Sequence, residues 1–256
     1  MNQWVIRGLR TGIKSTRYPT SKESLPGVSP GLPAATPMSS DSTQSMILRC
    51  PTAALEAAEQ GTAVDLRRCI NCFRCVRGVP HPMGWDGEYE CGSANPTEDA
   101  TRQRFGSAFR HSIQILVVDA GDCGACLNEV RQLNNPYYNI HRLGFFLTPS
   151  PRHADVLLVV GALTEHMRLP LRKAYEAMPT PKRVVAVGAC ALSGGIFGRS
   201  FMCAGGVSDL LPVDVEVPGN PPPPLAVLHG LLVAVGRKSS ARLHRRMEPS
   251  QGEATE

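Results

Sequence analysis

The chain has 256 residues, of which 42% are hydrophobic and 5% aromatic, and its formal net charge at pH 7 is +5. This length suits one large domain or two small ones, and the hydrophobic fraction is large enough to form a core. The positive charge is mild and lies partly in the C-terminal run RKSSARLHRR, so the composition does not indicate a nucleic-acid-binding protein.

The cysteine content bears on both compartment and chemistry. The opening residues MNQWVIRGLR lack the apolar core of a signal peptide, and the longest apolar stretch, residues 225–235, is about half as long as a membrane span. Without a secretory signal, nine cysteines favour metal ligation over a disulfide framework. We therefore expect a cytoplasmic protein, in which any membrane association comes through partners.

In chain order, the first expected unit is a flexible N-terminal arm over residues 1–47. Residues 15–45 are rich in Ser, Thr, Pro and Gly and show no apolar periodicity, so they cannot bury enough surface to offset the entropy of ordering. A polar connector is expected over residues 93–111. Between these two stretches, residues 48–92 form a compact segment that carries cysteines.

That segment contains an incomplete ferredoxin motif. Cys69, Cys72 and Cys75 have the C-x2-C-x2-C spacing that normally ends, after three more residues, in Cys-Pro. Here Pro80 is present, but the residue before it is Val79. Three thiolates cannot complete a four-cysteine site, so a fourth ligand has to come from elsewhere in the chain.

The fourth ligand is expected upstream, in the pair Cys50-Pro51. In two-cluster ferredoxins the Cys-Pro cysteine of each half-motif binds the cluster of the other half. The segment resembles such a ferredoxin after the loss of one complete ligand set, which predicts a single [4Fe–4S] cluster in a small ferredoxin-like α+β unit. A zinc site is the main alternative, although structural zinc sites usually pair two separate two-cysteine knuckles. The predicted ligands are Cys50, Cys69, Cys72 and Cys75.

The rest of the chain has the pattern of an α/β domain. Continuous apolar runs over residues 113–121, 154–163 and 183–191 are typical of strands buried on both faces of a parallel sheet. Helices are expected over 126–134, 166–178 and 223–236. This alternation predicts a doubly wound, flavodoxin-like domain over residues 112–236, followed by a solvated basic tail over 237–256. Contact of that tail with an anionic membrane or an acidic partner is the alternative.

A second cysteine group is expected at one edge of this sheet. Cys123 and Cys126 follow the first strand, and Cys190 follows a later one. Because the carboxyl ends of strands in an open α/β sheet line one crevice, these three thiols are predicted to meet there as a second cluster site. A C-x2-C pair alone also fits a redox dithiol. Cys91 and Cys203 are most simply buried hydrophobic residues, but either could be a further ligand.

From about residue 104 to 236 the chain resembles the small subunit shared by respiratory complex I and the [NiFe] hydrogenases, in particular the energy-converting hydrogenases of the formate hydrogenlyase type. The matching stretches are VDAGDCGACLNE, NNPYYNIHRLGFFLTPSPRHADVLLVVGALT, YEAMPTPKRVVAVGACALSGGIF and GGVSDLLPVDVEVPGNPPPP. The resemblance implies that Cys123, Cys126 and Cys190 hold the [4Fe–4S] cluster nearest the catalytic or quinone site of a large partner subunit.

One residue departs from the family pattern. The resemblance implies a fourth cysteine within VPG-Cys-PP, where this chain has Asn220, and an amide is a poor ligand for iron in a sulfide-rich cluster. Four alternatives stay open: a [3Fe–4S] cluster, a [4Fe–4S] cluster with water or an unusual ligand, a substitute thiol such as Cys203 or Cys91, and a site without iron.

These features predict an oxidoreductase subunit that relays electrons between the two clusters and has no catalytic residue of its own. The resemblance implies a large hydrogenase-like or 49 kDa-like partner subunit and integral, antiporter-like membrane subunits, with no role for nucleic acid. These partners would hold the chain at the inner face of the cell membrane. A quinone-reducing NADH dehydrogenase-like subunit is one alternative. A structural assembly subunit with a degenerate second site is the other.

Overall fold

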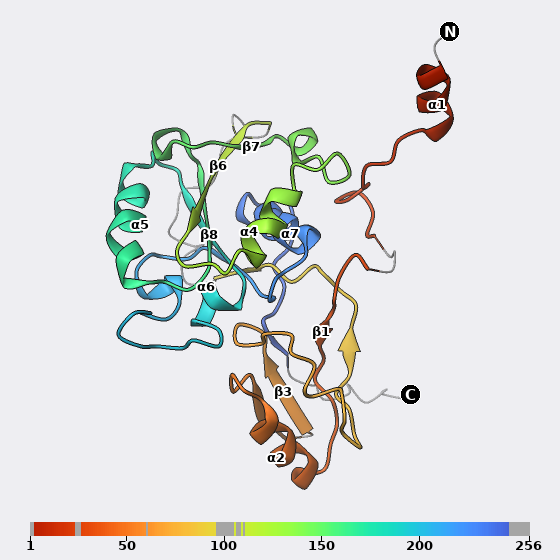
Figure 1. The fold of residues 1–256 in the computed structure, drawn as a ribbon, viewed down its shortest axis with the longest axis vertical. Coiled ribbons are helices and arrows are strands. Elements are labelled where there is room, and N and C mark those ends of the chain that lie inside the picture. The colour runs from red at the N-terminus through yellow and green to blue at the C-terminus, as the bar shows by residue number, and fades with distance from the viewer. Residues whose placement is uncertain are drawn as a thin grey trace, which may run out of the picture.

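The structure is a computed structural model that describes residues 3–23, 27–59, 61–95, 105, 109 and 111–245. It consists of an α/β part and a smaller part that contains α2 and β3, stacked along the long axis of the molecule (Figure 1). A further helix, α1 (Gln3–Thr11), stands away from both parts and buries none of its residues (Figure 1). Most of the expected connector over residues 93–111 lies outside the described residues.

The α/β part is built on one mostly parallel sheet. Among the described residues its strands are β5 (Ser93–Ala94), β6 (Ile113–Asp119), β7 (Phe145–Leu147), β8 (Val156–Val160), β9 (Arg183–Val187) and β10 (Val215–Val217). Their order is β5-β10-β9-β8-β6-β7, with β5 antiparallel at one edge. From β6 onward this is the 2-1-3-4-5 order of flavodoxin-like sheets, which confirms the predicted fold class.

Strand lengths explain which strands the sequence analysis found. All five residues of β8 and of β9 are buried, so each reads as a continuous apolar run. The strands β7 and β10 have three residues each and were not predicted, because so short a run carries no usable pattern. The run expected as a strand over residues 183–191 ends earlier, and its last residues begin helix α6 (Ala189–Ser193).

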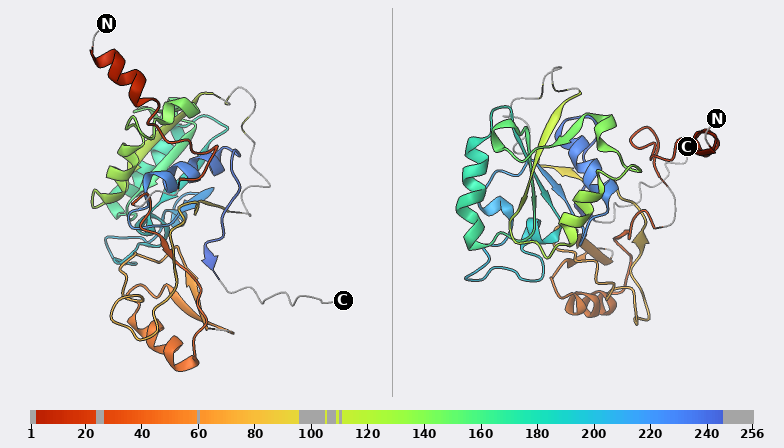
Figure 2. Two further views of the ribbon diagram at one scale, coloured as in Figure 1. Left: turned by 90° about the vertical axis from the view of Figure 1, so that its right-hand side faces the viewer. Right: turned by 45° about the horizontal axis from the view of Figure 1, so that its top comes forward.

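Helices cover both faces of this sheet, as a doubly wound fold requires. The helices α4 (Ala125–Gln132) and α7 (Pro224–Ala234) lie on one face, and α5 (Glu165–Ala177) lies on the other (Figure 1, Figure 2). Every residue of α7 is buried, and apart from His229 its sequence is apolar all round. Short 3₁₀ turns occupy Ile140–Leu143, Pro151–His153 and Val207–Asp209. None of the described helices is long and apolar enough to cross a membrane.

The smaller part combines helix α2 (Ser40–Arg49) with two small sheets. One sheet is antiparallel, in the order β11-β3-β2, with β2 at Leu55–Ala58, β3 at Gly61–Asp65 and β11 at His244–Arg245. The other pairs β1 (Leu32–Pro33) with β4 (Trp85–Asp86). The third strand of the first sheet therefore comes from the far end of the chain.

Two expectations about the ends of the chain need correction. The region expected to be a flexible arm contains helix α2, capped by Ser39, whose side chain accepts a hydrogen bond from Ser42 N, and a fully buried tyrosine, Tyr18. The expected solvated tail contains β11 and the buried Leu243. In both cases long-range contacts stabilise segments whose local composition predicts no structure.

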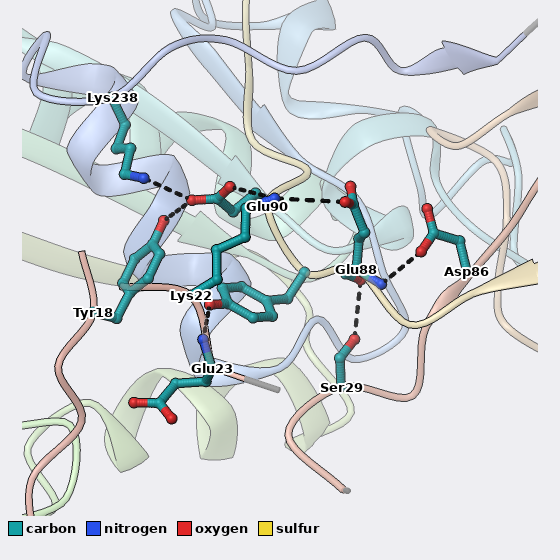
Figure 3. Close-up of polar contacts among 9 residues, drawn as sticks. Tyr18, Lys22, Glu23, Ser29, Asp86, Glu88, Glu90 and Lys238 are labelled. Carbon is teal, nitrogen blue, oxygen red and sulfur yellow. Dashed lines mark hydrogen bonds and ion pairs between the residues drawn. The ribbon is translucent and has the colours of Figure 1, made fainter. Parts of the chain in front are cut away.

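Glu90 is the centre of the contacts that hold both terminal segments (Figure 3). Its carboxylate accepts a hydrogen bond from Tyr18 Oη at 3.0 Å and contacts the ammonium groups of Lys22 and Lys238, each at 2.9 Å. Burial alone would raise the pKa of Glu90, but the hydrogen bonds from Lys238, Lys22 and Tyr18 lower it to about 2. A charged Glu90 therefore links the segment before β1, the segment after β4 and the segment after α7.

His229 in α7 makes the stability of the fold depend on pH. Its side chain is 2% exposed, and its Nδ1 accepts a hydrogen bond from Gly92 N at 2.9 Å. Burial lowers the pKa of His229 to about 4. The imidazole of His229 therefore binds a proton more readily in the unfolded chain than in the folded one. As a result, the contribution of His229 to stability is present above pH 6.5 and is lost as the pH falls toward 4.

We predict that the free energy of unfolding will be about 1 kcal/mol lower at pH 5.5 than at pH 7.5 because of this histidine. His229→Asn keeps an acceptor near Gly92 N but has no titratable group, so it should lose this share of the pH dependence. Urea unfolding followed by circular dichroism at the two pH values measures the difference. An equal pH dependence in wild type and His229→Asn would contradict the assignment.

Candidate functional site

The first predicted cysteine group comes together in the smaller part. Cys50 ends helix α2, and the other three cysteines lie in the loop between β3 and β4. All four line a single pocket with an empty volume of about 400 Å³, part of which is open to solvent. The remaining lining is mostly apolar: Pro33, Met46, Arg49, Thr52, Ala54, Leu55, Ile70, Phe73, Arg74 and Trp85.

The loop turns its thiols inward through two residues with left-handed backbone. Asn71 has φ 50° and Phe73 has φ 59°, a region that a bulky residue rarely adopts. The Phe73 conformation is supported by its ring, which packs against Trp85 with a centroid distance of 4.5 Å, and by its carbonyl, which accepts from the N–H groups of Val76 and Arg77. Unusual backbone held in place by its surroundings is typical of binding loops.

The donor set suits a metal cluster. Burial raises the pKa of the Cys69 thiol to about 12, and it also raises the pKa of Cys75. Thiolates at such a site need nearby positive charge, which iron supplies. The backbone N–H of Ala54 points at the Cys50 sulfur at 3.3 Å, a contact of the kind that tunes the potential of an iron–sulfur cluster. The four cysteines therefore fit a cluster in their chemistry and in their placement around one pocket.

The second predicted group lies at the carboxyl ends of the parallel strands. Cys123 and Cys126 follow β6, and Cys190 lies in the first turn of α6 after β9. Burial is the main cause of the raised pKa of Cys126, and the nearby Asp122, Cys190 and Cys123 raise it further. The mutual effects of these three thiols on their pKa values show that they lie near one another at this edge of the sheet.

Two glycines leave room for these sulfurs. A Cβ atom on Gly188 would lie 2.6 Å from the Cys126 sulfur, and one on Gly195 would lie 2.7 Å from the Cys190 sulfur. Both glycines also have left-handed backbone, with φ 90° and 56°. No side chain larger than hydrogen fits at either position without displacing a thiol. The sequence analysis selected neither glycine, because no motif marks Gly188 at the end of β9 or Gly195 after α6.

Two aspartates that the sequence analysis did not select shape the turn before α4. Asp119 Oδ1 accepts from the N–H groups of Gly121 and Asp122, and Asp122 Oδ2 accepts from those of Gly124 and Leu127. These bonds fix the loop that presents Cys123 and Cys126. Aspartate side chains often accept hydrogen bonds from backbone N–H groups two or three residues later in a turn. The pattern VDAGDCG could therefore have revealed the roles of Asp119 and Asp122.

The first cysteine loop contacts the edge of the sheet that carries the second cysteine group. Asn220 Nδ2, at the position where the family pattern has cysteine, donates to the carbonyl of Ile70 inside the first cysteine loop at 3.2 Å. Ser193 Oγ donates to Arg67 O at 3.0 Å, and Arg67 Nε lies 2.7 Å from Glu216 Oε2. Arg67 is therefore part of the junction between the two parts of the protein.

The remaining cysteines are buried, as the sequence analysis expected. Cys91 is 3% exposed, and Cys203 is 6% exposed. Cys203 is near enough to Cys190 to contribute to its raised pKa, after burial, Cys123 and Asp122. Among the described residues, no three His, Cys, Asp or Glu side chains form a group suited to a single metal ion.

Comparison with known proteins identifies the α/β part. Residues 123–234 match the family described as NADH ubiquinone oxidoreductase, 20 Kd subunit. Formate hydrogenlyase subunit 7 of Escherichia coli is 37% identical over 163 residues, which cover 64% of this chain but only 60% of that protein. The probable membrane-bound hydrogenase subunit mbhJ of Pyrococcus furiosus is 39% identical over 142 residues, covering 56% of this chain and 84% of that protein.

An uncharacterized protein of Methanocaldococcus jannaschii, MJ0516, is 42% identical over 139 residues, covering 54% of this chain and 93% of that protein. Among solved structures, a chain of the membrane-bound sulfane sulfur reductase, an archaeal respiratory membrane complex, gives a TM-score of 0.44 at 30% identity over 52% of this chain and 76% of that one. An NAD+-reducing [NiFe]-hydrogenase gives a TM-score of 0.39 at 18% identity, over 50% of this chain and 93% of that one.

The resemblance seen in the sequence is thus confirmed: the chain belongs to the family of the 20 kDa subunit of NADH ubiquinone oxidoreductase, whose members are oxidoreductase subunits and typically bind an iron–sulfur cluster.

Proposed function

We propose that this chain is the electron-transfer subunit of a membrane-associated, hydrogenase-like complex. It relays electrons between a [4Fe–4S] cluster held by Cys50, Cys69, Cys72 and Cys75 and a second iron–sulfur cluster held by Cys123, Cys126 and Cys190. The observation that carries the proposal is the pair of hydrogen bonds from Asn220 Nδ2 to Ile70 O and from Ser193 Oγ to Arg67 O, because they join the first cysteine loop to the sheet edge and to α6, the helix that carries Cys190.

The residues around each group are suited to one-electron transfer. Bound clusters supply the redox chemistry, while the chain supplies thiolates to both clusters and, at the first group, the Ala54 N–H donor and a mostly apolar lining. Each group also has one exposed cysteine, Cys72 in the first and Cys123 in the second. In the proposed relay, electrons enter at one of these exposed cysteines and leave at the other. The Ile70–Asn220 contact lies between the two groups.

An apolar surface beside the second group supports a large partner subunit. Ile196 and Phe197 are each 64% exposed and follow Gly195, while Phe201 and Met202 extend the same loop. Such a cluster of exposed apolar side chains marks an interaction surface. We propose that a large catalytic subunit docks there, since relatives include subunits of formate hydrogenlyase and of a membrane-bound hydrogenase. Integral membrane subunits would complete the complex, and quinone is the alternative electron acceptor.

The second cluster has three cysteine ligands in this proposal. The Asn220 amide nitrogen is engaged with Ile70, and an amide binds such iron poorly, so Asn220 is assigned to the junction. A [3Fe–4S] cluster, or a [4Fe–4S] cluster whose fourth ligand is water or Cys203, fits this arrangement. The same observation favours a second candidate function, in which the chain is an assembly subunit that conducts no electrons through its degenerate second site.

We predict that Cys50→Ala will remove the first cluster and about four iron atoms per chain. Cys91→Ala is the matched control, because it removes a buried thiol that lies outside both groups. The measurements are iron and acid-labile sulfide content after anaerobic purification. Full iron content in Cys50→Ala would show that the upstream cysteine is not a ligand.

We predict that Gly188→Ala will abolish the EPR signal of the second cluster, because its Cβ would lie 2.6 Å from the Cys126 sulfur. The signal of the first cluster should persist, which also shows that the variant is folded. Gly87→Ala is the control, since nothing lies within 4 Å of its added Cβ. An unchanged second signal in Gly188→Ala would contradict the assigned site.

The relay itself is tested in the assembled complex with Cys190→Ala. We predict that dithionite will still reduce the first cluster, while electron delivery to the large subunit stops because the second cluster is lost. Freeze-quench EPR follows the first cluster, and hydrogen or quinone turnover follows delivery. Turnover at the wild-type rate would favour the assembly subunit over the relay.

A further inference from the structure

Helix α1 presents an exposed apolar face. Trp4 is 73% exposed and Leu9 is 77% exposed, and no residue of the helix is buried. At 100° per residue, Trp4, Val5, Ile6, Gly8 and Leu9 fall on one arc of the helix. Ile13, two residues beyond the helix end, is 91% exposed. The apolar face therefore continues past the helix.

The opposite arc of α1 is cationic. It carries Arg7 and Arg10, and the following residues add Lys14 and Arg17. No acidic residue occurs in the sequence before Glu23, so nothing in this segment neutralises the four cations. Trp4 lies at the border between the apolar and the polar arc, where an amphipathic ring is favoured at a membrane–water interface. A short helix of this composition is typical of segments that lie in the headgroup region of an anionic membrane.

A short tether fixes the position of α1 relative to the body. Thr16 N donates to Tyr137 O at 2.8 Å, and the Tyr18 side chain is fully buried. The five-residue step from Thr11 to Thr16 spans at most about 17 Å. The helix therefore cannot move far from the α/β part, and in Figure 1 it lies at the opposite end of the long axis from α2.

We propose that α1 binds directly to the surface of an anionic lipid membrane, with its apolar arc in the interface and its arginines among the headgroups. This contact adds to any attachment through partner subunits and does not depend on the clusters. It orients the molecule with the α/β part toward the membrane and the smaller part, with α2 and Cys50, away from it.

Co-sedimentation of the full chain with vesicles tests the proposal. Vesicles of phosphatidylcholine with 30% phosphatidylglycerol should bind the wild-type chain at least about tenfold more strongly than phosphatidylcholine alone, and 0.5 M salt should reduce the difference. Brominated lipid should quench fluorescence in the wild type but not in Trp4→Phe. Substitutions in α1 should leave the fold intact, because α1 has no buried residue.

Matched substitutions on α5 control for charge and apolarity. Arg7→Glu/Arg10→Glu and Leu9→Glu should each lower binding at least about tenfold. On α5, Arg172→Glu/Lys173→Glu reverses two exposed cations, and Leu169→Glu alters a leucine that is 63% exposed. Both should stay within about twofold of the wild type. Wild-type binding that does not depend on phosphatidylglycerol would overturn the proposal. So would binding only to membranes that retain their proteins, since the helix would then dock on a protein.

Discussion

The organisation of this protein depends on the contact between the first cysteine loop and the carboxyl edge of the parallel sheet. Side chains of Asn220, Ser193 and Glu216 all reach residues 67–70 of that loop. Two of these contacts use backbone carbonyls of the loop, so they hold its path regardless of the side chains around it. Each part of the protein supplies one group of thiols, and the junction decides how near those groups lie.

Much of this arrangement could be predicted from the sequence because its causes are local. Buried parallel strands such as β8 are continuous apolar runs, and their shared direction determines where Cys126 and Cys190 lie. The pairing of Cys50 with the downstream triplet followed from the logic of ferredoxin motifs, and the structure places all four around one pocket.

What the sequence could not reveal depends on contacts between distant residues. The ion pair of Arg67 with Glu216 spans 149 positions in the sequence, and Lys238 reaches Glu90 across 148. No local pattern marks either pair. The segment before β1 has the composition of a disordered arm, yet Tyr18 is fully buried there because the fold supplies its surroundings. Asn220 was recognised as a departure from the family pattern, but its role at the junction needed the position of Ile70.

The strand β11 has a consequence for the order in which the protein can form. It pairs with β3, and the Leu66 N–H donates to Leu243 O next to that pairing. Almost all residues of the smaller part come before residue 95. However, its three-stranded sheet lacks its third strand, β11, until residues 243–245 have been synthesised. The last helix of the α/β part, α7, ends at Ala234, so during synthesis this part can complete its elements before the smaller part does, although most of its sequence comes later.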